Sequence, residues 1–224
     1  MDLVYICRDG DNEELRYSIR SAVANLPHDN IWVFGGKPDW YIGNHVRLKQ
    51  NANKYDNARA NLAAISRHYD VSENFVLMND DFFTVRPVDE IKNYHRGTME
   101  GHIDMVKFSV GYRALLEETR DVLNYLGYEN PLSYELHVPM IMNKTNLAKV
   151  IRTLGLWRSN YGNMYNVGGD RYDDVKVHNH VTLEQILNNP LPYISTNDDT
   201  FEGVLDSYLR ETFSEPSKYE KSPQ

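Results

Sequence analysis

Cysteine is nearly absent from this sequence: the chain has one, Cys7, among 224 residues. A framework of internal disulfides is therefore excluded, and with it the class of small secreted domains that such frameworks hold together. Cys7 ends the apolar segment LVYIC, so we expect a buried thiol in a reducing compartment. A cysteine nucleophile is disfavoured as well, because no base lies near it in the sequence.

Long apolar runs are missing too. No window reaches the length needed to span a bilayer, and the opening MDLVYI shows no basic leader followed by an apolar stretch. We therefore expect a cytoplasmic protein that has no membrane segment.

Positive charge is in short supply: 24 Lys and Arg stand against 32 Asp and Glu, for a formal net charge of −8. This balance disfavours a general affinity for nucleic-acid phosphates or anionic membranes, and leaves a local basic groove open. No phosphate-cradling Walker loop is present, and Gly35-Gly36 predicts only a turn. His178 and His180 have a spacing found in zinc sites, but no cysteine pair accompanies them, so we assign them to an acceptor loop.

Short apolar runs and helical patterns alternate along the chain, which is the order that βα units produce. Asp11 or Asn12 is placed to cap the first helix. The apolar runs predict strands at 3–6, 31–34 and 75–78, and the apolar spacing predicts helices at 15–26, at about 56–68, and around 115–123 and 201–209.

Two regions lack such patterns. Residues 155–180 are rich in Gly, Asn, Tyr and His without a clear period, which predicts a long functional loop. The last residues, EPSKYEKSPQ, predict a flexible tail at 214–224. The fold class that follows is α/β: a single domain over residues 1–213 with a central, mostly parallel sheet flanked by helices.

Two adjacent carboxylates, Asp80 and Asp81, follow the third predicted strand in FVLMNDDFF. Ligands bind at the carboxyl ends of strands in an open α/β sheet, so the pair is a metal or substrate site, or else a turn, which Asn and Asp also favour. Phe82 and Phe83 continue the apolar pattern and place the carboxylates near packed surface, where like charges repel unless a cation compensates them. Mg²⁺ or Mn²⁺ carrying a diphosphate suits such ligands.

Four stretches of the chain resemble, in order, the conserved regions of the Stealth family of sugar-phosphate transferases. They are MDLVYICRDGDNEELRYSIRSAV, NKYDNARANLAAI with FVLMNDDFF, LSYELHVPMIM, and YISTNDDTFEGVLDSYLRETFSEPSKYE. The wording is most similar to short bacteriophage proteins described as glycosyltransferases. The resemblance implies a GT-A-like nucleotide-sugar transferase fold, a divalent ion on the strand-end acidic motif, and the host cell cytoplasm if a phage encodes the chain.

The resemblance also implies a donor-binding region. The family's YTWVDG reads YICRDG here, so Cys7 and Arg8 replace residues near the donor pocket, and an FNS-like helix start reads Tyr55-Asp56-Asn57. The implied donor contacts are Tyr5, Arg8, Asp9, Arg16, Asp56 and Asn57.

Two of these donor contacts have ordinary structural alternatives. Asp9 contacts the nucleotide or the sugar, or else belongs to a capping turn before the helix. Arg16 and Arg20 lie one helical turn apart, so they reach phosphate together or form a solvated stripe paired with Glu13 and Glu14.

His137 is the candidate general base or acceptor contact, because transfer to a hydroxyl needs a group that titrates near neutrality. The alternative is a satisfied core histidine beside the run VPMIM. Glu135, two positions away in an extended segment, would orient or replace the imidazole. Arg158 would neutralise the leaving diphosphate. Asp198 and Asp199 repeat the acidic motif and would complete the metal site or cap the following helix.

The function that these residues predict is a glycosyltransferase that uses a nucleotide-sugar donor, most simply a UDP-sugar, with Mg²⁺ or Mn²⁺. The acceptor hydroxyl would belong to a protein, a glycan or a modified DNA base. Two alternatives remain open: a sugar-1-phosphate transferase that releases nucleoside monophosphate, and a non-catalytic protein that binds sugar or nucleotide.

Overall fold

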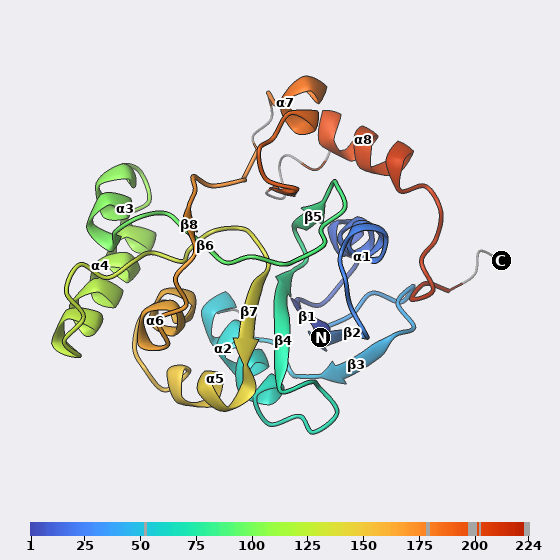
Figure 1. The fold of residues 1–224 in the computed structure, drawn as a ribbon. Helices are drawn as coiled ribbons and strands as arrows, with labels where there is room; N and C mark the ends of the chain where they lie inside the picture. Colours follow the sequence, from blue (N-terminus) through green and yellow to red (C-terminus); the bar gives the residue numbers. More distant parts are fainter. Residues whose placement is uncertain (52, 178–179, 197–200, 202, 222–224) are drawn as a thin grey trace.

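A five-stranded sheet forms the centre of the computed structural model, which describes residues 1–51, 53–177, 180–196, 201 and 203–221 (Figure 1). The strand order is β3-β2-β1-β4-β7; the first four strands are parallel and the last is antiparallel. The α/β class and the mostly parallel sheet are therefore confirmed. The strands are β1 (Asp2–Cys7), β2 (Ile31–Gly35), β3 (Asn44–Arg47), β4 (Asn74–Asn79) and β7 (Met140–Asn143).

Both faces of the sheet are covered, which explains why its central strands are almost continuously apolar. Leu3 and Tyr5 of β1 face the helix α1 (Glu13–Asn25), whereas Val4 packs on the opposite side with α2 (Lys54–Ile65), α5 (Lys144–Val150) and α6 (Trp157–Met164). The predicted strands and the first two predicted helices are confirmed. Asn12 caps α1, since its Oδ1 accepts from the backbone N of Leu15 at 2.8 Å.

The remaining elements surround this sheet. These elements are β5 (Phe82–Thr84), β6 (Tyr94–His95), α3 (Met99–Met105), α4 (Val110–Tyr125), β8 (Asp170–Arg171), α7 (Leu183–Leu187), β9 (Tyr193–Ser195) and α8 (Val204–Thr212). Helices α3 and α4 lie on one side of the sheet, and α7 and α8 lie beyond β5 (Figure 1). β5 pairs with β9 and β6 pairs with β8.

The prediction of a long loop at 155–180 is wrong, because this region contains α6 and β8. The inward face of α6 is polar: Ser159 and Asn160 are fully buried and hydrogen-bonded. A helix that buries polar side chains shows no apolar period, which is why the sequence pattern did not indicate it.

Strand β5 is held by side chains of α1 along the edge that does not pair with β9. Ser18 Oγ donates to the carbonyl of Phe82, the backbone N of Thr84 donates to Ser21 Oγ at 3.1 Å, and Asn25 Nδ2 donates to the carbonyl of Thr84 at 2.6 Å. These three α1 residues lie on one face of the helix because they are spaced three and four apart. The helix thereby fixes the segment that follows the acidic pair.

The expected flexible tail at 214–224 is corrected for residues 217–221, which pack on the domain. Glu220 is 6% exposed and accepts from Arg20 Nε at 2.8 Å and Nη2 at 2.7 Å. The Tyr219 ring stacks on Tyr41 with a centroid distance of 6.4 Å. The polar composition of the segment predicts mobility. In the structure, the Arg20 guanidinium of α1 compensates the desolvation of the Glu220 carboxylate, so the segment packs on the domain.

Replacing Glu220 by alanine should lower the free energy of unfolding by about 3–5 kcal/mol, because it leaves the Arg20 charge buried and unpaired. Burial would raise the pKa of Glu220, but the hydrogen bonds and charge of Arg20 lower it. The carboxylate therefore stabilises the fold above the unfolded pKa of about 4.3, and this contribution is lost as the pH falls through the folded pKa. Urea unfolding at pH 7 and in acid measures both effects, with Glu215→Ala, an exposed glutamate of the same segment, as control.

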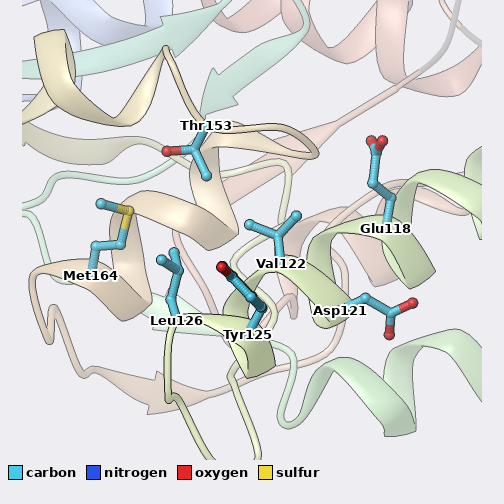
Figure 2. A pocket seen from close by; sticks show the side chains of 7 residues that line it. All are labelled: Glu118, Asp121, Val122, Tyr125, Leu126, Thr153 and Met164. Carbon is cyan, nitrogen blue, oxygen red and sulfur yellow. The ribbon is translucent and has the colours of Figure 1, made fainter.

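An apolar hollow lies on the surface between α4 and α6 (Figure 2). It is lined by Glu118, Asp121, Val122, Tyr125, Leu126, Thr153 and Met164. None of these residues belongs to the acidic motif or to the segment of His137, so the hollow is separate from the candidate site. Within the described part of the chain, no helix is both long and apolar enough to cross a membrane.

Candidate active site

The acidic pair forms the turn that links β4 to β5 at the carboxyl end of the central sheet. Asp80 Oδ2 accepts from Asn12 Nδ2 at 2.6 Å, so the residue that caps α1 also holds the first carboxylate. Burial and then the charge of Asp81 raise the pKa of Asp80 to about 6. The alternative of a turn is therefore present, and the charge of Asp81 opposes ionisation of Asp80; a metal or substrate role for the pair stays a prediction.

Asp81 meets two side chains from the C-terminal part of the chain. Its Oδ2 accepts from Ser195 Oγ at 2.9 Å and lies 3.8 Å from Lys176 Nζ. Ser195 is the last residue of β9, and Lys176 forms a β-bridge with it. Neither contact was predicted, although Ser195 stands three residues before Asp198 of the second acidic motif. Asp198 and Asp199 of that motif lie outside the described residues.

His137 lies beside this turn and is bound by Asp174. The imidazole Nδ1 is 2.9 Å from Asp174 Oδ1 and 3.0 Å from Oδ2. The ring meets Phe82, the residue after the acidic pair, edge-on at a centroid distance of 6.3 Å. The imidazole is therefore a hydrogen-bonded, part-exposed group and not a core histidine, since its side chain keeps 32% of its surface exposed.

The role predicted for Glu135 as the partner of His137 is corrected. Glu135 Oε1 accepts instead from the backbone N and the Oγ of Ser159, at 3.0 and 2.9 Å, and so binds the first turn of α6. Burial raises the pKa of Glu135, while the nearby Arg158 charge opposes that rise. Asp174 is the partner of the imidazole instead. The one sequence signal for this role is that Asp174 lies in a stretch rich in Asp and His.

Arg158 is buried beneath Phe82 and holds the segment that carries His137. Its Nη1 donates to the carbonyl of Val138 at 2.9 Å and to that of Leu136 at 3.4 Å, and its guanidinium lies 5.3 Å from the Phe82 ring centre. Burial lowers the pKa of Arg158 to about 10, against the opposing charges of Glu135 and Asp81. Its Nη2 has no hydrogen-bond partner in the described part of the chain. A contact with the leaving diphosphate stays a prediction.

The donor side predicted around β1 is partly corrected. Tyr5 is fully buried in the core, where its hydroxyl accepts from Ser18 Oγ at 3.2 Å. The Tyr5 side chain therefore does not face a donor. Cys7 is buried, which confirms the predicted buried thiol, and burial and then the Asp80 charge raise its pKa to about 12. Arg8 is exposed at the strand end, where its charge acts on Asp80.

Asp9 joins the ends of β1 and β3, because Arg47 donates to its Oδ1 at 2.5 Å and to its Oδ2 at 3.2 Å. Gly36 packs its backbone against this loop, and a Cβ there would meet the carbonyl of Arg8 at 2.4 Å. Gly35 has a φ of +105°, and a Cβ on it would meet the carbonyl of Cys7 at 2.3 Å. The glycine pair therefore permits a close approach of two strand ends as well as a turn.

The other predicted donor contacts have structural partners. Arg16 Nε donates to Glu13 at 2.8 Å, and its guanidinium lies over Trp40 at 4.7 Å and near Glu220 at 3.5 Å. Asn57 Oδ1 accepts from the backbone N of Asn51 at 2.8 Å and braces the loop before α2. Asp56 is exposed on that helix. Donor contacts by these three residues stay predictions.

The side chains at the end of β4 carry oxygen atoms of the kind that hard cations take as ligands. Asp80 and Asp81 are adjacent, and the Oδ1 of Asn79 is buried without a hydrogen-bond partner in the described part of the chain. No group of three or more His, Cys, Asp or Glu side chains among the described residues is placed to hold a metal. Two carboxylates are nevertheless enough for Mg²⁺, which takes its other ligands from water and substrate phosphate.

Comparisons with known proteins indicate the fold. No protein-family model matches the chain, and no curated protein sequence matches it. The chain is similar to a galactosyltransferase, LgtC, solved with donor and acceptor sugar analogs: 10% identity, 100% of this chain and 98% of that chain covered, TM-score 0.50. It is also similar to the apo-form glycosyltransferase GlyE of Streptococcus pneumoniae TIGR4: 12% identity, 97% of this chain and 65% of that chain covered, TM-score 0.39. The likeness to LgtC shows that the chain has a GT-A glycosyltransferase fold.

Proposed function

We propose that this chain is a glycosyltransferase that moves a sugar from a nucleotide-sugar donor to a hydroxyl acceptor. One observation carries the proposal: the acidic turn after β4 lies beside the His137–Asp174 pair. Phe82 joins the two, since it follows Asp81 in sequence and contacts the imidazole. A carboxylate pair for the donor and a positioned base for the acceptor are the two parts that the reaction needs, and the fold supports this reading.

In the proposed reaction, the acceptor oxygen attacks the anomeric carbon of the donor sugar. The bond from that carbon to the diphosphate oxygen breaks, and its electron pair stays on the diphosphate. The acceptor proton passes to His137 Nε2, because Nδ1 is held by Asp174. Lys176, 3.8 Å from Asp81, and the buried Arg158 supply positive charge near the diphosphate as its charge grows.

Mg²⁺ or Mn²⁺ would be held by Asp80 and Asp81 and would neutralise the donor diphosphate when bound. The support for a metal at this position is electrostatic. Burial and the Asp81 charge oppose ionisation of Asp80, and a bound cation would stabilise the ionised form of both carboxylates. Arg8 and Asp9 stand at the adjacent strand end, where the rest of the donor, a UDP-sugar in our proposal, would lie.

Incubation with Mn²⁺, hydroxyl acceptors and each nucleotide sugar in turn should release UDP from a UDP-sugar or GDP from a GDP-sugar, whereas a CMP-sugar would release CMP. Chromatography identifies the nucleotide. Protein, glycan and modified-DNA acceptors are tested separately. Release of UMP from a uridine donor would instead show the sugar-phosphate transfer that the Stealth motifs suggest. Binding without turnover would show a non-catalytic protein; a donor at 100 times its Kd stabilises the fold by about 2.7 kcal/mol, so thermal unfolding detects it.

A further inference from the structure

His137 is held at its ring by Asp174 and at its backbone by Arg158. Both carboxylate oxygens of Asp174 lie within hydrogen-bond distance of Nδ1, at 2.9 and 3.0 Å. The carbonyls on either side of His137, those of Leu136 and Val138, are bound by the buried Arg158. The ring and the backbone that carries it are therefore both fixed.

Asp174 is itself fixed by Arg96. Arg96 Nη1 donates to Asp174 Oδ2 at 3.1 Å, and both side chains are mostly buried, with 18% and 20% of their surfaces exposed. Burial would raise the pKa of Asp174, but the hydrogen bond and charge of His137 and the charge of Arg96 lower it to about 2. An ionised carboxylate only accepts hydrogen bonds, so the proton between the two groups belongs to Nδ1.

The segment that carries Asp174 also reaches the acidic turn. Lys176 lies two residues further on and approaches Asp81, while the backbone N of Ser195 donates to the carbonyl of Val175 at 3.2 Å. One short segment thus contacts both the proposed base and the proposed donor carboxylates. The segment 174–176 therefore links the imidazole to the acidic turn.

We infer that Asp174 is a positioning residue that keeps His137 in the tautomer with the proton on Nδ1 and turns Nε2 toward the acceptor hydroxyl, and that Arg96 aims Asp174. The inference rests on the proposed function for its catalytic part. The tautomer itself is a property of the free protein, because every contact that sets it lies within the chain.

The test begins with ¹⁵N NMR of the free protein at about pH 8, above the ordinary titration range of histidine. Long-range proton–nitrogen correlations distinguish a protonated from an unprotonated ring nitrogen, and comparison with His137→Gln assigns the signals. We expect Nδ1 of His137 to carry the proton. In Asp174→Asn the amide group offers a donor to Nδ1, so the proton should move to Nε2.

The kinetic arm compares Asp174→Asn with Asp173→Asn, an exposed aspartate next to it in the same segment. Asp174→Asn should lower kcat on the order of 10²-fold or more with the donor KM little changed, whereas Asp173→Asn should match the wild type. A wild-type ring protonated on Nε2, or an Asp174→Asn variant with unchanged tautomer and kcat, overturns the inference. If the wild type transfers no sugar, the proposed function fails, and the NMR result still decides whether Asp174 sets the tautomer.

Discussion

His137→Ala is expected to lower the rate of sugar transfer on the order of 10²-fold or more while donor binding is largely retained. The imidazole packs edge-on against Phe82, the residue that follows the acidic pair, and Asp174 already orients it. Its loss removes the acceptor of the hydroxyl proton but leaves Asp80, Asp81 and Lys176 in place. Turnover at saturating donor and donor-induced thermal stabilisation measure the two quantities independently.

The matched control is His28→Ala. His28 lies before β2, at the opposite end of the strands from the acidic turn, and its Nδ1 is 2.8 Å from the carbonyl oxygen of Leu26, two residues before it. We expect this variant to keep wild-type turnover. A His137→Ala protein that transfers sugar at the wild-type rate would exclude His137 as the base.

Asp80→Asn is expected to change stability and activity in opposite directions. At pH 7 without metal, the free energy of unfolding should rise on the order of 2 kcal/mol, because the native structure holds the Asp80 carboxylate next to Asp81 in a part-buried turn. Turnover and metal-dependent donor binding should fall on the order of 10²-fold or more, because one of the two carboxylates for the cation is lost.

The stability gained by Asp80→Asn should depend on pH. The folded pKa of Asp80, about 6, lies above the unfolded value, so protonated Asp80 stabilises the wild-type fold in acid and that contribution disappears as the pH rises through about 6. The advantage of the variant should be absent near pH 4 and complete above pH 7. Chemical unfolding in the presence of chelator at both pH values measures it.

Asp70→Asn serves as the control for Asp80→Asn, because Asp70 is exposed in the turn that precedes β4. Like Asp80→Asn, it removes one negative charge, but near the other end of β4. We expect neither its stability nor its turnover to depart from the wild type. Equal turnover in the Asp80→Asn and wild-type proteins, with or without chelator, would exclude a metal role for Asp80.

The central sheet could be predicted from the sequence because parallel strands buried on both faces are continuous apolar runs. LVYI, IWVF and FVLM are such runs, and their carboxyl ends indicate the edge of the sheet where a ligand site is expected. The position of the acidic pair and the cap at Asn12 follow from local rules. These features depend only on residues that are close in sequence.

The partners of the charged side chains could not be predicted in the same way. Asp174 lies 37 residues from His137, and Glu220 lies 200 residues from Arg20. No local pattern distinguishes a carboxylate that will meet a guanidinium in the core from one that faces water. Glu135 is near His137 in sequence, but in the structure the backbone N and the Oγ of Ser159 in α6 donate to it.

The hydrogen bonds from α1 to β5 also bear on aggregation. A short strand with an open edge is a template for a strand from another molecule. β5 directly follows the part-exposed carboxylates of the acidic turn. Ser18, Ser21 and Asn25 occupy the backbone groups of Phe82 and Thr84 that such a strand would need. A second chain would have to displace a whole helix before it paired there. The acidic turn can therefore stay part-exposed while the backbone of the adjoining strand is not available for pairing with a strand of another molecule.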